Sequence, residues 1–193
     1  MENPRVAKIF DNTAISAFIN EIPSIKMLVV CSKRYTLTTS IEVYYEALDG
    51  SDQKSIDSCF SDILVVDKNP QSSYSRLIEE LSDRYPYLHK GDISSFLLAY
   101  MDYAVHGKPY FFVTDDKTLR KRIPDLLGSA TLKSVTKKEI QQFNVTGIIG
   151  LMRHIADNGD LSKSDIELII IDLRKSTFYV TEELLSYLRS GKK

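Results

Sequence analysis

The sequence predicts a three-layer α/β/α fold with a central, mainly parallel β-sheet, followed by a helical C-terminal tail. Two observations support this prediction. Short apolar runs alternate with longer segments of helical periodicity through the first two thirds of the chain, a pattern typical of strand–helix–strand crossovers. After residue 136 the periodicity is helical only. With 193 residues, the chain has the length of one domain.

The strands are predicted from short runs rich in apolar and β-branched residues. Turn-forming residues bound them, such as Asn69-Pro70 after the third run and Pro109 before the fourth. The predicted strands lie at 6–10, 35–39, 63–66, 110–113 and 130–135.

The helices are predicted from apolar residues spaced three and four apart. Ser40 can cap the helix that carries Val43 and Ala47, and Gly107 ends the most strongly apolar helix. The other predicted helices lie at 13–20, 23–30, 72–84, 92–105 and 117–127, and in the tail at 137–143, 146–157, 163–174 and 181–189. We expect one domain over residues 1–193, with an α/β core in 1–136 and the tail of 137–193 packed on that core.

Composition excludes some classes of protein. A net charge of −1 argues against wholesale electrostatic binding of nucleic acid, but it allows a local basic patch. Cys31 and Cys59 are far apart and form no metal-binding pair, so we expect both to be reduced. No apolar run approaches the roughly 18 residues of a membrane helix, and no signal peptide follows Met1. A cytoplasmic protein with no membrane partner is expected.

Carboxylates recur where predicted strands end and helices begin. Because ligand sites of open parallel sheets lie at the carboxyl ends of the strands, these side chains are expected to converge. Carboxylate oxygens suit Mg²⁺ or Mn²⁺, and such ions promote phosphodiester hydrolysis. The acids are Asp11 after the first strand, Glu46 in the helix after the second, Asp92 at a helix start, and Asp115 and Asp116 after the fourth strand.

Each acid also has a plain structural interpretation. Asp11 and Asp92 suit helix caps, and the pair at 115–116 suits a turn or a helix start. Glu46 could be a solvated surface residue, and Glu42, one turn earlier, could take its place. The prediction of a site therefore depends on the combination of these positions on one parallel sheet.

Four short motifs surround the acids, and in order and spacing they resemble those of PIN-domain nucleases over nearly the whole chain. The tail segments 146–151, 158–161 and 178–185 add a less specific similarity to VapC-type toxins, a prokaryotic branch of that family. The motifs are Ile9 to Thr13, a strand running into Asp; Ser40, Val43 and Glu46, spaced by three; Gly91-Asp92, opening an apolar helix; and Val113 to Asp116, a strand running into Thr-Asp-Asp, with Arg120 on the next helix.

The resemblance implies an endoribonuclease that needs metal and leaves 5′-phosphate and 3′-hydroxyl ends. It implies that Asp11, Asp92 and Asp116 hold one or two Mg²⁺ or Mn²⁺ ions and that Glu46 and Asp115 complete the catalytic site. By the Thr-x-Asp spacing of the family, Asp116 is preferred to Asp115, although other branches place the acid at Asp115. The supporting residues would be Thr13, Thr114 and Arg120.

Substrate binding is expected to use local positive charge. Lysines and arginines are frequent between residues 117 and 138, where Asp125 is the single aspartate. A solvated helix face explains this run equally well. The candidate RNA-binding residues are Lys117, Lys121, Arg122 and Lys133.

The expected partners are an RNA substrate, a second copy of the chain in a homodimer and, for a toxin, an antitoxin protein. One alternative is a catalytically inactive PIN-like module that binds RNA or protein; Ser94 favours it, because some relatives carry a further acid at that position. A phosphatase-like protein with an Asp nucleophile ranks last. It would need an Asp-x-Asp motif, and Thr13 stands two residues after Asp11.

Overall fold

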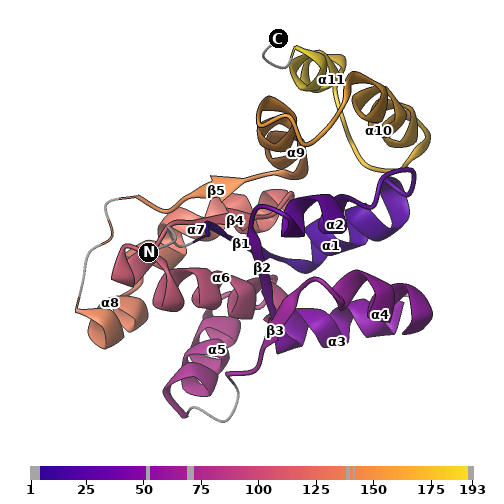
Figure 1. The fold of residues 1–193 in the computed structure, drawn as a ribbon. Coiled ribbons are helices and arrows are strands. Elements are labelled where there is room, and N and C mark those ends of the chain that lie inside the picture. The colour runs from indigo at the N-terminus through magenta and orange to yellow at the C-terminus, as the bar shows by residue number, and fades with distance from the viewer. Residues whose placement is uncertain (1–4, 51–52, 69–71, 138–139, 141, 191–193) are drawn as a thin grey trace.

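The computed structural model describes residues 5–50, 53–68, 72–137, 140 and 142–190. Within these residues the centre is a five-stranded, fully parallel sheet with helices on both faces, so the predicted fold class is confirmed (Figure 1). The strand order β3-β2-β1-β4-β5 puts β1 in the middle. The strands are β1 (Ala7–Phe10), β2 (Thr36–Ser40), β3 (Leu64–Val66), β4 (Tyr110–Val113) and β5 (Val145–Thr146).

Helices fill the connections between the strands and form the C-terminal part of the chain. The N-terminal ones are α1 (Asn12–Ser16), the π-helical turn η1 (Ala17–Glu21), α2 (Met27–Ser32), α3 (Ile41–Gly50) and α4 (Gln53–Phe60). The middle of the chain holds α5 (Ser72–Arg84), α6 (Lys90–Asp102), the short 3₁₀ helix η2 (Ala104–His106), α7 (Lys117–Gly128) and α8 (Ala130–Thr136). The tail helices are α9 (Ile148–Asp157), α10 (Lys163–Lys175) and α11 (Glu182–Arg189).

The register of the sheet brings the ends of β1 and β4 together. Phe10 pairs with Val113, so both strands end at the same level of the sheet. The next residue, Asp11, donates its backbone N–H to the Val113 carbonyl at 3.2 Å. Asp11 and Thr114 therefore leave the carboxyl edge of the sheet side by side, at the place where parallel sheets bind ligands.

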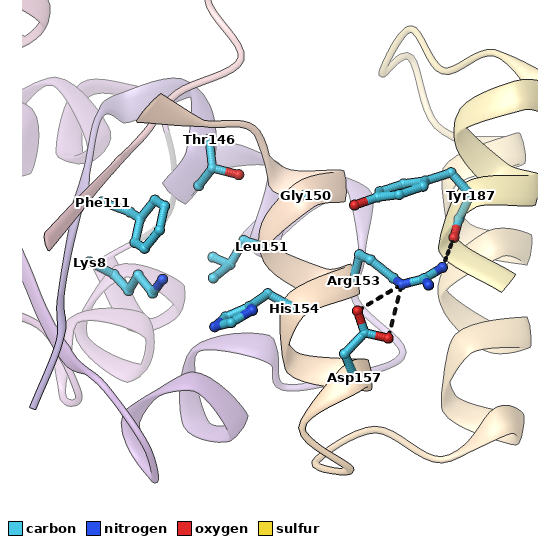
Figure 2. Close-up of a pocket in the computed structure, with 9 residues that line it drawn as sticks. All are labelled: Lys8, Phe111, Thr146, Gly150, Leu151, Arg153, His154, Asp157 and Tyr187. Carbon is cyan, nitrogen blue, oxygen red and sulfur yellow. Dashed lines mark hydrogen bonds and ion pairs between the residues drawn. The ribbon is translucent and has the colours of Figure 1, made fainter. Parts of the chain in front are cut away.

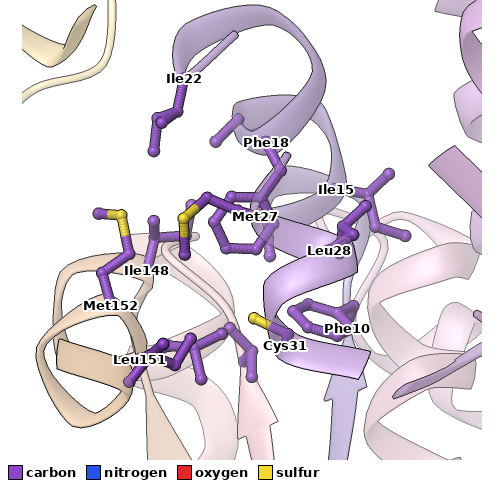
Figure 3. Packing of buried hydrophobic residues seen from close by; sticks show 14 of the residues in the cluster. Phe10, Ile15, Phe18, Ile22, Met27, Leu28, Cys31, Ile148, Leu151 and Met152 are labelled. Atoms are coloured by element: carbon purple, nitrogen blue, oxygen red, sulfur yellow. The ribbon is translucent and has the colours of Figure 1, made fainter. Parts of the chain in front are cut away.

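The two faces of the sheet carry separate apolar clusters, because alternate strand residues point to opposite sides. Ala7 and Ile9 of β1 pack with α5, α6, α7 and α8. Phe10 points the other way and packs with α1, α2 and the tail helices. Figure 3 shows this second cluster, in which Met27 of α2 lies beside Ile148 and Met152 of α9. The tail therefore shares one hydrophobic core with the middle of the sheet.

The predicted strand at 130–135 is wrong, because this segment forms the helix α8. Ser129 starts the helix by accepting the Leu132 backbone N–H on its hydroxyl at 3.3 Å. Leu132 is buried, whereas Val135 is 45% exposed. A strand in the sheet would bury alternate residues, which this segment does not do.

The predicted helix at 137–143 is wrong where it can be judged. Part of it (138–139 and 141) lies outside the described residues, and 142–144 are not helical. The chain instead continues into β5, where the prediction places the start of a helix at 146. The sequence also did not predict α4. None of the helices in the described part of the chain is long and apolar enough to cross a membrane.

Candidate acidic active site

Asp11 is the most deeply buried of the predicted acids. It has no exposed surface and caps α1, where its carboxylate accepts the Ala14 backbone N–H at 2.9 Å. The Thr13 hydroxyl lies 2.8 Å from both carboxylate oxygens. Burial raises the pKa of Asp11 to about 7, the hydrogen bonds act in the opposite direction, and the charge of Asp92 raises the pKa further. Asp11 thus combines a structural cap with an unfavourably buried charge.

Two threonine hydroxyls connect the ends of β1 and β4. Thr114 is fully buried and donates its hydroxyl hydrogen to Asp11, while the same oxygen accepts the Asp116 backbone N–H at 3.1 Å. The Thr13 oxygen in turn accepts the Asp115 backbone N–H at 3.3 Å. Both threonines predicted as supporting residues therefore hold the acids of the two strands in one network.

Asp92 brings the start of α6 into the same acidic region. It is 5% exposed, and its Oδ2 accepts the His89 backbone N–H at 3.0 Å in a capping box. Burial raises the pKa of Asp92 to about 6 against the lowering effect of that hydrogen bond, and the charges of Asp116 and Glu46 raise the pKa further. Asp92 is therefore in electrostatic contact with acids from two other elements.

Glu46 reaches this region from α3. Its Oε1 accepts the Gly91 backbone N–H at 2.8 Å, in the first turn of α6. Burial raises the pKa of the Tyr74 phenol, and the charge of Glu42, the alternative considered from the sequence, raises it further, so Glu42 lies near Tyr74. The structure thus places Glu46, and not Glu42, next to Asp92.

The neighbouring acids Asp115 and Asp116 have different partners. Asp116 caps α7 by accepting a backbone N–H on Oδ1 at 2.7 Å, and its charge acts on Asp92. The Oδ2 of Asp115 accepts the Ile148 backbone N–H at 2.6 Å, and its Oδ1 lies 3.9 Å from the Arg120 guanidinium. Burial raises the pKa of Asp115, while the Ile148 hydrogen bond and Arg120 oppose that shift. Asp116 therefore belongs with Asp11 and Asp92, whereas Asp115 connects β4 to the tail.

Two glycines allow these acids to approach the backbone closely. A Cβ on Gly91 would lie 2.4 Å from Oε2 of Glu46, and a Cβ on Gly147 would lie 2.4 Å from Oδ1 of Asp115. Gly91 is part of a predicted motif, but the contribution of Gly147 was not predicted. That contribution depends on how α9 packs beside β4, and the spacing of residues does not encode it.

The acids have the right donor chemistry for a hard cation, but their side chains are not gathered around one point. In the described part of the chain, no group of three or more His, Cys, Asp or Glu side chains is placed to hold a metal ion. Asp11, Asp92 and Asp116 each cap a helix, as their alternative interpretation expected. Each of these caps uses one carboxylate oxygen, so the second oxygens would have to be brought to a common point to bind one ion. Mutual repulsion of the carboxylates opposes that arrangement, and a bound dication would offset the repulsion.

Two hollows lie along α1, one lined by Asp115 and the other by Glu46, and Asp11, Asp92 and Asp116 line neither of them. The larger, of about 420 Å³, is lined by Thr13, Asp115 and Tyr179, and Asn12 borders both hollows. The smaller, of about 70 Å³, reaches Glu46. Tyr179, in the loop before α11, is 73% exposed. Sequence analysis did not single out Tyr179, because an isolated aromatic residue in a loop carries no recognisable pattern.

The four predicted RNA-binding residues lie on α7 and α8 and differ in their contacts. Lys117 is at the start of α7, with its Nζ 4.5 Å from the centre of the Tyr179 ring. Arg122 is engaged at 2.9 Å by an acid on its own helix. Lys121 and Lys133 are exposed. Of these four, Lys117 is the cation that contacts the rim of the larger hollow.

Neither a scan against protein-family models nor a search of curated proteins finds a match to the chain. The PIN-type assignment therefore stays a prediction that depends on the motif residues and on the geometry of the acids.

Proposed function

We propose that the protein is a metal-dependent endoribonuclease of PIN type that hydrolyses RNA phosphodiester bonds. The observation that carries this proposal is the electrostatic coupling of acids from four elements. The charge of Asp92 acts on Asp11, and the charges of Asp116 and Glu46 act on Asp92. Buried carboxylates whose pKa is raised by burial and by neighbouring acids, as for Asp11 and Asp92, are typical of functional sites, and a hard dication relieves the repulsion.

Asp11, Asp92 and Asp116 would hold Mg²⁺ or Mn²⁺, with Glu46 beside them. When bound, such an ion supplies an activated water molecule and stabilises the charge on the phosphate. The chain itself contributes orientation. Thr114 holds Asp11 through its hydroxyl, and Asp115 fixes the end of β4 against α9.

The surroundings of the acids favour single-stranded RNA as substrate. The hollow of about 420 Å³ runs from Thr13 and Asp115 to the exposed ring of Tyr179. An exposed aromatic ring next to a cation suits a stacked base with its phosphate, and such stacking does not depend strongly on sequence. In this arrangement Tyr179 would stack a base and Lys117 would contact the backbone.

The first experiment is cleavage of labelled single-stranded RNA by purified protein with Mn²⁺, Mg²⁺ or EDTA. We expect cleavage with either metal, none with EDTA, and none in Asp11→Asn. Asp83→Asn is the matched control, because it makes the same change in an exposed acid of α5 outside the site. Metal-independent cleavage, or full activity in Asp11→Asn, would contradict the proposal.

A second candidate is a PIN-like module that binds RNA or protein without cutting. The capping role of three of the acids favours it, because caps alone would explain why those residues are acidic. Calorimetric titration with Mn²⁺ separates the two functions. A nuclease binds the ion and loses that binding in Asp11→Asn, whereas the module binds none. The homodimer and the antitoxin partner stay predictions.

A further inference from the structure

A second pocket lies apart from the acids, between the sheet and the tail helices α9 and α11. Its volume is about 230 Å³, and none of the proposed catalytic acids lines it. Figure 2 shows Lys8 entering from β1, Phe111 from β4, and His154 on α9 across from them. The pocket is smaller than the roughly 300–1,000 Å³ of sites for drug-sized ligands, so it suits a small molecule.

Lys8 is the unusual residue of this pocket. It is 2% exposed in the central strand of the sheet, a position at which lysine is rarely found. Its Nζ lies 4.0 Å from the centre of the Phe111 ring and 4.4 Å from that of Tyr35. The rings stabilise the ammonium group but do not replace the hydrogen-bond acceptors of its three N–H bonds. Among the described residues, Lys8 has no hydrogen-bond acceptor and no ion-pair partner.

The other ionisable groups near Lys8 do not neutralise it. Burial raises the pKa of the Cys31 thiol to about 12, and burial lowers the pKa of the His154 imidazole, so both are neutral at pH 7. Asp157 is an acid in the lining, but it is engaged by Arg153 at 3.1 Å. Arg153 also donates to the carbonyls of Tyr187 and Ser190. Burial lowers the pKa of Lys8 itself to about 8, so the amine is still mostly protonated at pH 7. Lys8 therefore supplies the uncompensated positive charge among the described residues of the lining.

We infer that this pocket binds a small monovalent carboxylate with an apolar or aromatic body, whose carboxylate pairs with the ammonium group of Lys8. The charge of the ligand follows from one buried cation that lacks a counter-ion, because an unpaired buried charge is costly. The apolar or aromatic body of the ligand is inferred from the pocket walls, to which Phe111, Leu151 and Tyr187 contribute apolar surface. A single cation matches a carboxylate better than a phosphate, which is usually held by several donors.

The test uses benzoate as the probe, with benzamide as its neutral isostere and inorganic phosphate as a second anion. Calorimetry would measure binding to the full-length protein and to Lys8→Met, which keeps most of the length of the side chain and removes its charge. Lys108→Met is the matched control, because Lys108 is exposed, lies two residues before β4 and is outside the pocket. Circular dichroism would show that both variants are folded.

We expect benzoate to bind, and benzamide and phosphate to bind at least about tenfold more weakly. Lys8→Met should lose at least about tenfold in benzoate affinity, which is the loss typical of a removed charged partner. Lys108→Met should bind like the unaltered protein. Absence of benzoate binding, equal binding of benzamide, or phosphate binding as tight as benzoate would overturn the inference.

Should Lys8→Met fail to fold, amide chemical shifts of the unaltered protein decide the matter. Benzoate should shift the resonances of Phe111, Gly150 and Leu151, which line the pocket. Shifts confined to other parts of the chain would place the ligand elsewhere and overturn the inference. The outcome does not depend on whether the acids cleave RNA.

Discussion

At the scale of single residues, the raised pKa of Asp11 makes stability depend on pH. Its pKa is about 7 in the folded protein and about 3.9 in an unfolded chain. Between these values the folded state binds more protons, so stability falls as pH rises from about 4 to about 7 and then levels off. The metal-free protein should therefore lose stability across this range because of Asp11.

Asp11→Asn should remove this contribution. As pH rises from 4 to 8, the free energy of unfolding of the unaltered protein should fall, relative to that of the variant, by an amount on the order of 3 kcal/mol. Urea titration in EDTA would measure both free energies. Asp83→Asn provides the comparison for an exposed acid and should not show this gain. Parallel pH profiles for Asp11→Asn and the unaltered protein would mean that Asp11 is not destabilised by burial.

A metal ion should stabilise the protein more as pH rises, because the ion binds the ionised carboxylates and releases their protons. Mn²⁺ affinity, measured by calorimetry, should weaken as pH falls from about 7 to about 6, where burial and the neighbouring charges favour protonation of Asp11 and Asp92. Buffers with different ionisation enthalpies would reveal the released protons. Binding that is independent of pH and releases no protons would count against these two ligands.

At the scale of elements, the approach of α3 to α6 is set by Gly91. In Gly91→Ala, the new Cβ would lie 2.4 Å from Glu46 Oε2, so the carboxylate must move and leave the Gly91 N–H. Alanine favours the helix by up to about 1 kcal/mol, which offsets the lost hydrogen bond. We expect a cleavage rate lowered about tenfold or more, with stability changed by less than about 1 kcal/mol.

Gly128→Ala is the control for that substitution, because nothing lies within 4 Å of a Cβ at Gly128. It should leave cleavage unchanged. If Gly91→Ala also cleaves RNA at the normal rate while keeping its fold, Glu46 does not take part in the reaction.

The elements also show what the sequence can and cannot specify. The strands β1 to β4 were predicted to within one residue, since each is an apolar or β-branched run. The helix α8 was predicted as a strand because Ala130 to Val135 contains β-formers, while the cap at Ser129 decides the outcome. The two-residue strand β5 is too short to have a pattern, and it is held by backbone hydrogen bonds to β4, such as Thr114 N–H to the Thr146 carbonyl at 3.0 Å.

The candidate site, too, could be predicted from the sequence only in part. The sequence predicts that Asp11 and Asp116 leave strands at the same edge of a parallel sheet, and the structure adds that these strands, β1 and β4, are neighbours. The contact of Glu46 with Gly91 depends on the packing of two helices, and that of Asp115 with Ile148 depends on the tail. Neither contact follows from residue spacing, because both connect elements far apart in the sequence.

At the scale of the whole molecule, the tail and the sheet depend on each other. One apolar cluster contains Phe10 of β1, Ile15 of α1 and Ile169 of α10. Asp172 of α10 also accepts the backbone N–H and the hydroxyl of Ser24, both at 2.8 Å. Because these contacts join both ends of the chain, we expect the tail and the α/β core to unfold together.

Substitutions in α10 test this cooperativity. Ile169 is fully buried, so Ile169→Ala should lower the free energy of unfolding by about 2–5 kcal/mol. Its neighbour Leu168 is 42% exposed, so the control Leu168→Ala should lower it by less than about 1 kcal/mol. Amide hydrogen exchange should show the loss from Ile169→Ala in the protection of β1 as well as of α10, because a cooperative unit opens as a whole. If α10 loses protection while β1 keeps its own, the tail is a separate folding unit. The hydrogen bond between Asp115 and the Ile148 N–H at the start of α9 could then break without unfolding the acidic site.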